Sequence, residues 1–267
     1  MQVKWSDCAL ILAGHGSTEN PDSSLPARAL VNELEKRQLF REVQAAFWLE
    51  DPGYASCLEG IEADHVFIVP HFTAEGYYTK EIVPREFGLR GRVSRHPDRW
   101  IYYCDPAGLH PSMTDAILAR VHELRLKAVD QEICLMIAGH GTPRHRNSQA
   151  VVLSQVEKLR KRGDFGQVEA AFMEVDPLIE HWDQTSRYNN VVMVPYFMSD
   201  GLHVTEDIPQ LIGVKEGQWP DPYTRAGKSI WYTRSIGTSS SMVEVILEMV
   251  RGFDPNQPFC SHCPDRV

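Results

Sequence analysis

The sequence lacks long hydrophobic runs: no stretch reaches the roughly 18 consecutive apolar residues that a membrane-spanning helix needs. Residues 1–7 also lack the charged start and the long apolar stretch of a secretory signal peptide. Both absences argue against membrane insertion and secretion. We therefore expect a cytoplasmic protein with no membrane partner.

Positive charge is scarce as well. The 267 residues include 27 Lys and Arg against 36 Asp and Glu, which gives a net charge of -9. A general nucleic-acid binder would show a basic excess or patch, so this balance argues against nucleic acid as a partner. It also means that a polyanionic small substrate would have to be met by local basic residues.

Nucleotide-binding motifs are absent and cysteines are few. Neither G-x-x-x-x-G-K-[ST] nor G-x-G-x-x-G occurs. The six cysteines are Cys8, Cys57, Cys104, Cys134, Cys260 and Cys263. The first four stand singly in apolar surroundings and are expected to be reduced core thiols. Cys260 and Cys263 form a C-x-x-C, which could give two thiolates to Zn²⁺ or to an iron-sulfur cluster, or could be a loose thiol pair.

Strand-like and helix-like segments alternate along the chain. Ala27, Leu30, Val31 and Leu34 have the spacing of a helix with one apolar face. Apolar runs that predict strands occur in the first half at residues 8–13, 43–49, 66–70 and 100–104. This alternation predicts an α/β fold in which the sheet is mainly parallel.

The second half repeats the first. His140 lies 125 residues after His15. The same offset relates Ala45-Ala46-Phe47 to Ala170-Ala171-Phe172, Asp51-Pro52 to Asp176-Pro177, Val69-Pro70 to Val194-Pro195, and Pro84 to Pro209. Further on, Gly108 pairs with Gly237 at an offset of 129, so about four residues are inserted near 215–226. We predict two tandem Rossmann-like domains, at 1–128 and 129–253, and a tail at 254–267.

The two copies differ where strands are predicted to end. His140 aligns with His15, Glu174 aligns with Leu49, and His203 aligns with Tyr78. At these three aligned positions, only the second half therefore carries two imidazoles and a carboxylate. Because the carboxyl ends of parallel strands meet at one edge of the sheet, these three side chains can converge.

Two imidazoles and one carboxylate suit a borderline divalent cation such as Co²⁺, Fe²⁺, Ni²⁺ or Zn²⁺, and they leave coordination positions open. Imidazoles near neutrality also accept protons. A single histidine in a loop is more often a hydrogen-bonded structural residue. The case for chemistry at His140, Glu174 and His203 therefore depends on the three together.

Charged neighbours extend this candidate site. Arg144 and Arg146, in the segment PRHRNS at 143–148, could pair with substrate carboxylates, or could be ordinary solvated charges. Glu206 and Asp207 begin the helix after His203. They could orient its ring, or could be acids favoured by the helix dipole.

Three motifs occur together: GHGS at 14–17 and GHGT at 139–142, a V-P-x-F strand end in each half, and G-x-H-x-x-x-D-I-P at 201–209. At these residues the sequence resembles the two-domain CbiX-type sirohydrochlorin chelatases of the class II chelatase superfamily. The resemblance covers nearly all of residues 8–252. Two-domain members often keep the active set in the first half, whereas here Leu49 and Tyr78 stand at two of those positions.

The resemblance implies a lyase that inserts Co²⁺ or Fe²⁺ into sirohydrochlorin, a tetrapyrrole with eight carboxylates, for cobalamin or sirohaem synthesis. It implies that His140, His203 and Glu174 are the catalytic and metal-binding residues, with the two histidines as metal ligands or proton acceptors. Arg144, Arg146, His15 and Tyr78 are then candidates for binding the tetrapyrrole. Some members carry an iron-sulfur cluster near the C-terminus, which would fall on Cys260 and Cys263.

Two other functions remain open on the sequence. One is a noncatalytic carrier of a metal or a tetrapyrrole, which would bind its cargo without metallating it. The other is a hydrolase or isomerase that uses the histidines as acid and base. The choice between Co²⁺ and Fe²⁺, and between a monomer and a homodimer, also stays open.

Overall fold

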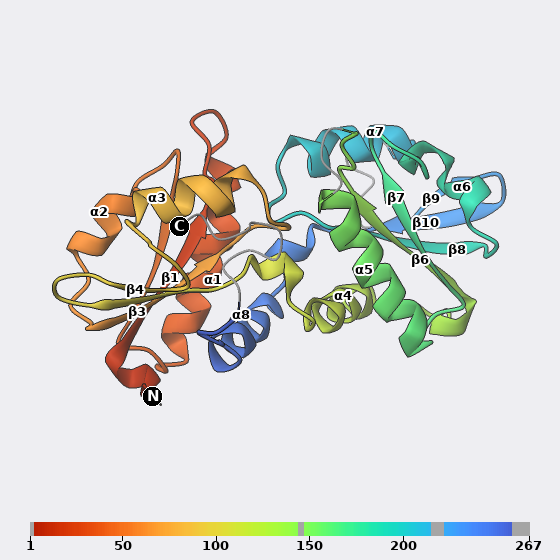
Figure 1. Ribbon diagram of the computed structural model, residues 1–267. Helices are drawn as coiled ribbons and strands as arrows, with labels where there is room; N and C mark the ends of the chain where they lie inside the picture. Colours follow the sequence, from red (N-terminus) through yellow and green to blue (C-terminus); the bar gives the residue numbers. More distant parts are fainter. Residues whose placement is uncertain (1–2, 144–146, 215–221, 258–267) are drawn as a thin grey trace. The chain divides into compact units, whose positions relative to one another are not determined.

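The computed structural model describes residues 3–143, 147–214 and 222–257. Its contacts divide the chain into two compact units. Unit 1 comprises Met1–His110 and Val243–Val267, and unit 2 comprises Pro111–Met242. Each unit is a sheet covered by helices on both faces (Figure 1).

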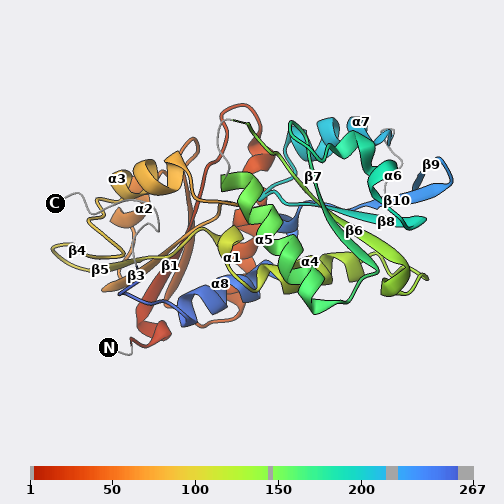
Figure 2. The same ribbon diagram turned by 45° about the vertical axis from the view of Figure 1, so that its right-hand side comes forward.

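The sheet of unit 1 has five strands in the order β2-β1-β3-β5-β4. Their bounds are β1 Cys8–Gly14, β2 Glu42–Phe47, β3 His65–Pro70, β4 Val93–Arg95 and β5 Trp100–Tyr103. The first four strands in this order are parallel, and β4 pairs antiparallel with β5 at the edge. Helices α2 (Tyr54–Glu59) and α3 (Val83–Glu86) cover one face, and α1 (Leu25–Lys36) and α8 (Met242–Arg251) cover the other (Figures 1 and 2).

Unit 2 repeats this order as β7-β6-β8-β10-β9. Its strands are β6 Ile133–Gly139, β7 Gln167–Phe172, β8 Asn190–Pro195, β9 Tyr223–Arg225 and β10 Lys228–Tyr232. Again only the edge strand, β9, is antiparallel. The helices are α6 (Trp182–Thr185) and α7 (Ile208–Ile212) on one face, and α5 (Asn147–Arg162) and α4 (Met113–His122) on the other.

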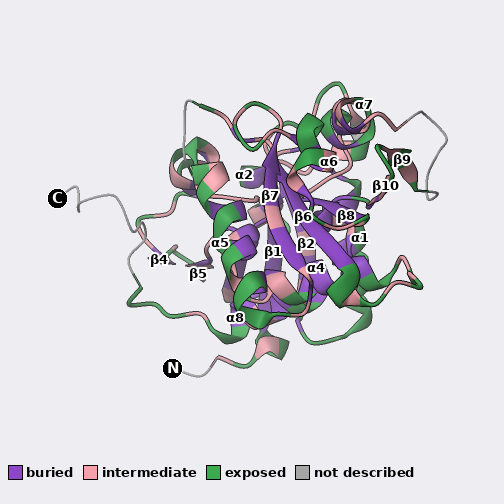
Figure 3. Cartoon of the chain, turned by 90° about the vertical axis from the view of Figure 1, so that its right-hand side faces the viewer, coloured by how far each residue is buried: buried purple, intermediate pink, exposed green. Residues whose placement is uncertain are grey.

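Burial on both faces explains the continuous apolar runs of the central strands. Every residue of β1 and of β6 is buried, so these strands show no polar alternation. Alternate residues of β6, such as Cys134 and Met136, pack against Trp182 and Ile208 on one face. The strands accordingly form the buried centre of each unit, and the helices expose their outer sides (Figure 3).

The last helix of each sequence repeat lies not in the unit that holds the sheet of its own repeat but in the unit whose sheet is formed by the other repeat. Helix α4 follows β5 of unit 1 in the chain but packs near β8 in unit 2. Helix α8 lies in unit 1, where Arg37, the residue after α1, donates to Glu244 at 2.8 Å. The compact units thus divide the chain differently from the sequence repeat, and the domain boundary at residues 128 and 129 stays a prediction.

The fold class predicted from the sequence is confirmed: both sheets are mainly parallel, and strands and helices alternate. The strands predicted in the first half agree with β1, β2, β3 and β5 within a few residues at each end, and the predicted repeat is seen in the same strand order of unit 2. The edge strands β4 and β9 were missed. Within the described ranges, no helix combines the length and apolar character that crossing a bilayer requires.

Candidate functional site at the carboxyl edge of unit 2

His140 follows β6 directly, at the carboxyl end of the central strand. Its carbonyl oxygen accepts the backbone N–H of Glu174 at 3.3 Å, just beyond the neighbouring strand β7. The next residue, Gly141, has a φ of +68°, and a Cβ atom there would lie 2.5 Å from Cβ of Phe172. Only glycine satisfies both conditions at low cost. The G-H-G turn therefore brings His140 and Glu174 to adjacent strand ends.

His203 begins a π-helical turn, His203–Asp207, after the loop that follows β8. The N–H of Ile208 donates to the carbonyl of His203, five residues earlier, and Pro209 then lacks an N–H. Nδ1 of His203 donates to Oδ2 of Asp207 at 2.6 Å. Since this bond occupies Nδ1, Nε2 is the ring nitrogen of His203 that can meet a substrate.

His140 lies next to both of the other candidate residues. The ring centroids of His140 and His203 are 5.0 Å apart, at 71° between the ring planes. Nε2 of His140 lies 3.7 Å from Oε1 of Glu174. The three side chains are 34%, 49% and 48% exposed for His140, His203 and Glu174. They form a solvent-facing set of nitrogen and oxygen donors at one edge of the sheet.

This arrangement is open rather than a closed metal cage. Among the residues that the structure describes, no group of three or more His, Cys, Asp or Glu side chains is placed to hold a metal ion. Imidazole nitrogens and carboxylate oxygens are donors that suit borderline divalent cations, and they are also groups that can take up protons.

The corresponding edge of unit 1 carries aromatic side chains instead. Tyr78 begins the π-helical turn Tyr78–Ile82, where unit 2 has His203. Its ring packs edge-on against His15, with ring centroids 4.4 Å apart and the planes at 83°. Nδ1 of His15 bonds to the carbonyl of Gly16 at 2.8 Å, and Leu49 is 39% exposed. The turns match those of unit 2, but unit 1 has Tyr78 and Leu49 at the positions aligned with the His203 imidazole and the Glu174 carboxylate.

A neighbouring carboxylate in unit 1, Glu50, serves the loop after His15. Oε1 of Glu50 accepts the N–H of Ser17 at 2.8 Å and the hydroxyl of Ser23 at 3.1 Å, and Arg28 lies 3.5 Å from Oε2. Partial burial raises the pKa of Glu50, but hydrogen bonds from Ser24, Ser17, Ser23 and Arg28 outweigh it, so the pKa is lower than usual. Unit 2 has Val175 at the aligned position. Glu50 therefore stabilises a loop and does not replace Glu174.

Four of the sequence predictions concern residues outside the described ranges: Arg144, Arg146, Cys260 and Cys263.

The other four cysteines are free and buried, as predicted. Burial raises the pKa of Cys8 to about 11 and that of Cys104 to about 12, so both thiols stay protonated at neutral pH.

The sequence did not single out Phe197, although its ring centroid lies 6.2 Å from that of His203. Phe72 takes the same place in unit 1, 6.2 Å from Tyr78. The shared V-P-x-F strand end was the signal that could have identified both. Leu202 and Tyr77, which precede His203 and Tyr78, are 59% and 65% exposed. Each edge therefore presents apolar surface beside its imidazole.

Fold and site together define a tandem α/β protein of the chelatase-like class. Among solved structures, it resembles the multi-domain protein DR2241 of Deinococcus radiodurans, described as structurally similar to chelatases but with two additional domains. That match has a TM-score of 0.81 and 25% identity, and covers 94% of this chain and 56% of the longer one. The sirohydrochlorin chelatase SirB of Bacillus subtilis, in complex with cobalt, matches with a TM-score of 0.65 and 19% identity. It covers 95% of this chain and 99% of SirB, and shows the same fold.

The amino-acid sequence identifies the family to which the protein belongs. The chain matches the CbiX family over residues 9–124 and 134–252, and it belongs to that family. It is also 34% identical over 274 residues to a protein of Halobacterium salinarum named as a probable sirohydrochlorin cobaltochelatase. That match covers 94% of this chain and 92% of the relative.

Proposed function

We propose that this protein is a sirohydrochlorin chelatase, a lyase that inserts Co²⁺ or Fe²⁺ into the tetrapyrrole for cobalamin or sirohaem synthesis. The observation that carries this proposal is the pairing of His140 with His203, at 5.0 Å between ring centroids, with Glu174 beside His140. Membership of the CbiX family and the name of the Halobacterium relative support it.

The proposed chemistry is an exchange of one divalent cation for two N–H protons of the tetrapyrrole. His140, His203 and Glu174 hold the incoming cation, which is a substrate, near the ring. The same groups accept the protons as the pyrrole nitrogens bind the metal. Asp207 keeps Nδ1 of His203 hydrogen-bonded at 2.6 Å, so that Nε2 faces the reaction. Solvent exposure of about one third to one half lets the protons leave.

The tetrapyrrole is proposed to be held through its flat face and its carboxylates. In unit 2, the exposed apolar side chain of Leu202, next to His203, suits a planar ring. His15 and Tyr78 stay predicted tetrapyrrole contacts; their rings pack together in unit 1. Arg144 and Arg146 are proposed to pair with the carboxylates. Local cations of this kind are needed because the chain as a whole carries a charge of -9.

Several finer assignments remain part of the proposal. Cobalt is favoured as the metal by the Halobacterium relative's name, with Fe²⁺ as the alternative. Cys260 and Cys263 are proposed to bind Zn²⁺ or an iron-sulfur cluster with further ligands. Action as a monomer or homodimer, without nucleic acid or membrane partners, is likewise a prediction.

An anaerobic turnover assay tests the function. Purified protein is mixed with sirohydrochlorin and excess Co²⁺ or Fe²⁺, and product is followed by absorbance. We expect many product molecules per chain. Formation of at most one product per chain, together with tight binding of metal or tetrapyrrole, would identify a carrier instead. A hydrolase or isomerase would keep its full activity after exhaustive chelation.

A further inference from the structure

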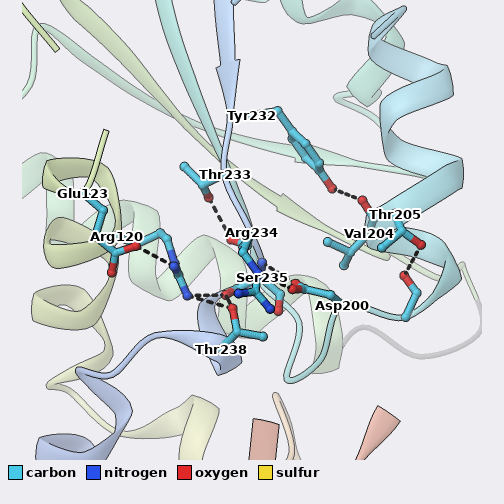
Figure 4. Close-up of polar contacts among 11 residues, drawn as sticks. Arg120, Glu123, Asp200, Val204, Thr205, Tyr232, Thr233, Arg234, Ser235 and Thr238 are labelled. Carbon is cyan, nitrogen blue, oxygen red and sulfur yellow. Dashed lines mark hydrogen bonds and ion pairs between the residues drawn. The ribbon is translucent and has the colours of Figure 1, made fainter. Parts of the chain in front are cut away.

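A buried arginine, Arg120, is connected through hydrogen bonds to the loop that precedes His203. Arg120, on α4 of unit 2, has a side chain that is 7% exposed. Its guanidinium donates to the carbonyl of Ser235 at 3.0 Å and to Oγ1 of Thr238 at 2.8 Å, and it pairs with Glu123 at 2.6 Å (Figure 4). Both terminal nitrogens of the guanidinium are hydrogen-bonded, which offsets the cost of burying its charge, while Nε is buried without a partner. The side chain therefore fixes the segment that follows β10.

The same segment binds the loop that precedes His203. Oδ1 of Asp200 accepts the N–H of Ser235 at 2.8 Å, and Oδ2 accepts Nε of Arg234 at 2.7 Å (Figure 4). The next residue, Gly201, accepts the N–H of Val204 at 2.8 Å and so begins the turn that carries His203. Arg120, Ser235 and Asp200 thus form a continuous polar chain from α4 to the base of this turn.

Unit 1 builds the same turns with other side chains. In both units a tyrosine hydroxyl supports the π-helical turn: Tyr232 donates to the carbonyl of Val204, and Tyr103 to that of Thr79, each at 2.7 Å. This contact belongs to the fold, because the two units share it.

The polar chain itself is replaced in unit 1. The aligned residues are Met249 for Arg120, Leu109 for Thr238, Pro106 for Ser235 and Glu75 for Asp200. Met249 is buried and apolar, and Pro106 has no N–H to donate. Unit 1 holds its loop by other bonds: Arg92 donates to Asp105 at 2.6 Å, and Glu75 pairs with Lys80 at 3.0 Å.

The polar chain is present in unit 2 and replaced in unit 1, and this difference shows whether the fold needs it. Unit 1 forms the same sheet and the same π-helical turn without the Arg120, Ser235 and Asp200 chain, so the fold does not depend on it. Among the residues that the structure describes, this chain of hydrogen bonds occurs only in unit 2, the unit whose π-helical turn begins with His203. We propose that Arg120, Ser235 and Asp200 are positioning residues that fix the loop before His203 and thereby its separation from His140. This inference rests on the proposed chelatase function.

Ser235→Pro is the sharpest test, because it reproduces unit 1 at a single position. Ser235 has φ -58° and ψ 151°, and Pro106 has φ -56° and ψ 136°, so proline fits the existing backbone. The variant loses the N–H that Asp200 accepts, and keeps the carbonyl that Arg120 needs. Ser235→Ala is the matched control: it keeps the N–H and removes a hydroxyl that is buried without a hydrogen-bond partner.

We expect Ser235→Pro to fold with a slightly lower melting temperature, because a hydrogen-bonded N–H is lost. It should insert Co²⁺ roughly 10-fold more slowly, because a small misplacement of a reacting group is costly. The KM for Co²⁺ should rise while the KM for sirohydrochlorin stays constant. Ser235→Ala should match the wild type. Wild-type kinetics for Ser235→Pro, or equal losses in both variants, would overturn the inference.

A second variant and a second readout separate the positioning role from the proposed function. Arg120→Met, which copies Met249, should raise the KM for Co²⁺ at least as much, whereas Arg160→Met, at a partly exposed arginine that donates to the carbonyl of Val168, should not. The visible absorption of Co²⁺ bound to the protein without tetrapyrrole reports on metal binding alone. If the wild type binds Co²⁺ but inserts none, the proposed function fails. An unchanged Co²⁺ spectrum and affinity in both Ser235→Pro and Arg120→Met would then reject the positioning role separately.

Discussion

The two units share a strand order, the G-H-G turn and the π-helical turn, yet their carboxyl edges differ in chemistry. Unit 2 places His140, His203 and Glu174 there, and unit 1 places His15, Tyr78 and Leu49. The scaffold therefore does not determine the chemistry. One edge carries nitrogen and oxygen donors at these positions and the other carries Tyr78 and Leu49, while the turns that present them are the same.

The strongest way to break this comparison is His203→Tyr, which gives unit 2 the residue of unit 1. We expect metal insertion to fall about 1000-fold, equivalent to about 4 kcal/mol of transition-state stabilisation, because both a cation ligand and a proton acceptor are lost. Turnover with Co²⁺ and sirohydrochlorin measures the loss. His181→Ala removes another exposed imidazole of unit 2 and should leave turnover unchanged. Retention of wild-type turnover by His203→Tyr would exclude His203 from the reaction.

A second difference concerns stability. His71 in unit 1 aligns with Tyr196 in unit 2; it is 6% exposed, and its Nε2 has no hydrogen-bond partner. Burial lowers the pKa of His71 from 6.5 to about 4. Between these pH values the unfolded chain binds a proton that the folded chain rejects, so acidification from pH 6.5 to 4 should cost up to about 3 kcal/mol of folding stability.

His71→Phe should remove this part of the acid sensitivity. The check is the free energy of unfolding of both proteins at several pH values. We expect their difference to change by about 3 kcal/mol between pH 7 and pH 4, because only the wild type has the buried imidazole. Parallel pH profiles for the two proteins would show that His71 does not titrate in this way.

Glu174→Leu copies Leu49 of unit 1. We expect roughly 100-fold slower insertion, because the carboxylate 3.7 Å from His140 no longer attracts the cation or takes up a proton. The measurement is kcat and KM for Co²⁺. Glu180→Leu, at another exposed glutamate of unit 2, serves as the control. A change confined to the KM for sirohydrochlorin would instead assign Glu174 to tetrapyrrole binding.

Asp207→Asn should have the smallest of these effects, about 10-fold in kcat, because it weakens the 2.6 Å bond that orients the His203 ring but leaves the imidazole in place. Rate against pH is the informative measurement. An unchanged profile and rate would mean that Asp207 is only an acid favoured by the helix start.

Much of this fold could be predicted because its signals are local or repeated. The central strands are continuous apolar runs, and the offset of 125 residues revealed the duplication and the mismatches at Leu49 and Tyr78. The edge strands β4 and β9 were missed because each has only three residues and no apolar run. The turn between β9 and β10 uses Ala226 and Gly227, both at positive φ, and Ala is unusual in such a hairpin turn.

The candidate site was predicted only in part. The rule that parallel strands end at one edge was enough to propose that His140, Glu174 and His203 are neighbours. The contribution of α4 could not be foreseen, because a repeat does not show which sheet its last helix packs against. Arg120 therefore looked like an ordinary helical residue, although it is bonded to a segment more than one hundred residues away in the chain.

Paired alanine variants of the two aligned histidines test most directly whether the chemistry belongs to unit 2. Multiple-turnover insertion of Co²⁺ into sirohydrochlorin is measured for His140→Ala and His15→Ala under identical conditions, with melting temperatures confirming that both are folded. We predict that His140→Ala loses about 1000-fold in turnover and that His15→Ala stays within about 10-fold of the wild type. Equal losses, or a larger loss in His15→Ala, would contradict the assignment of the reaction to the edge formed by His140, Glu174 and His203.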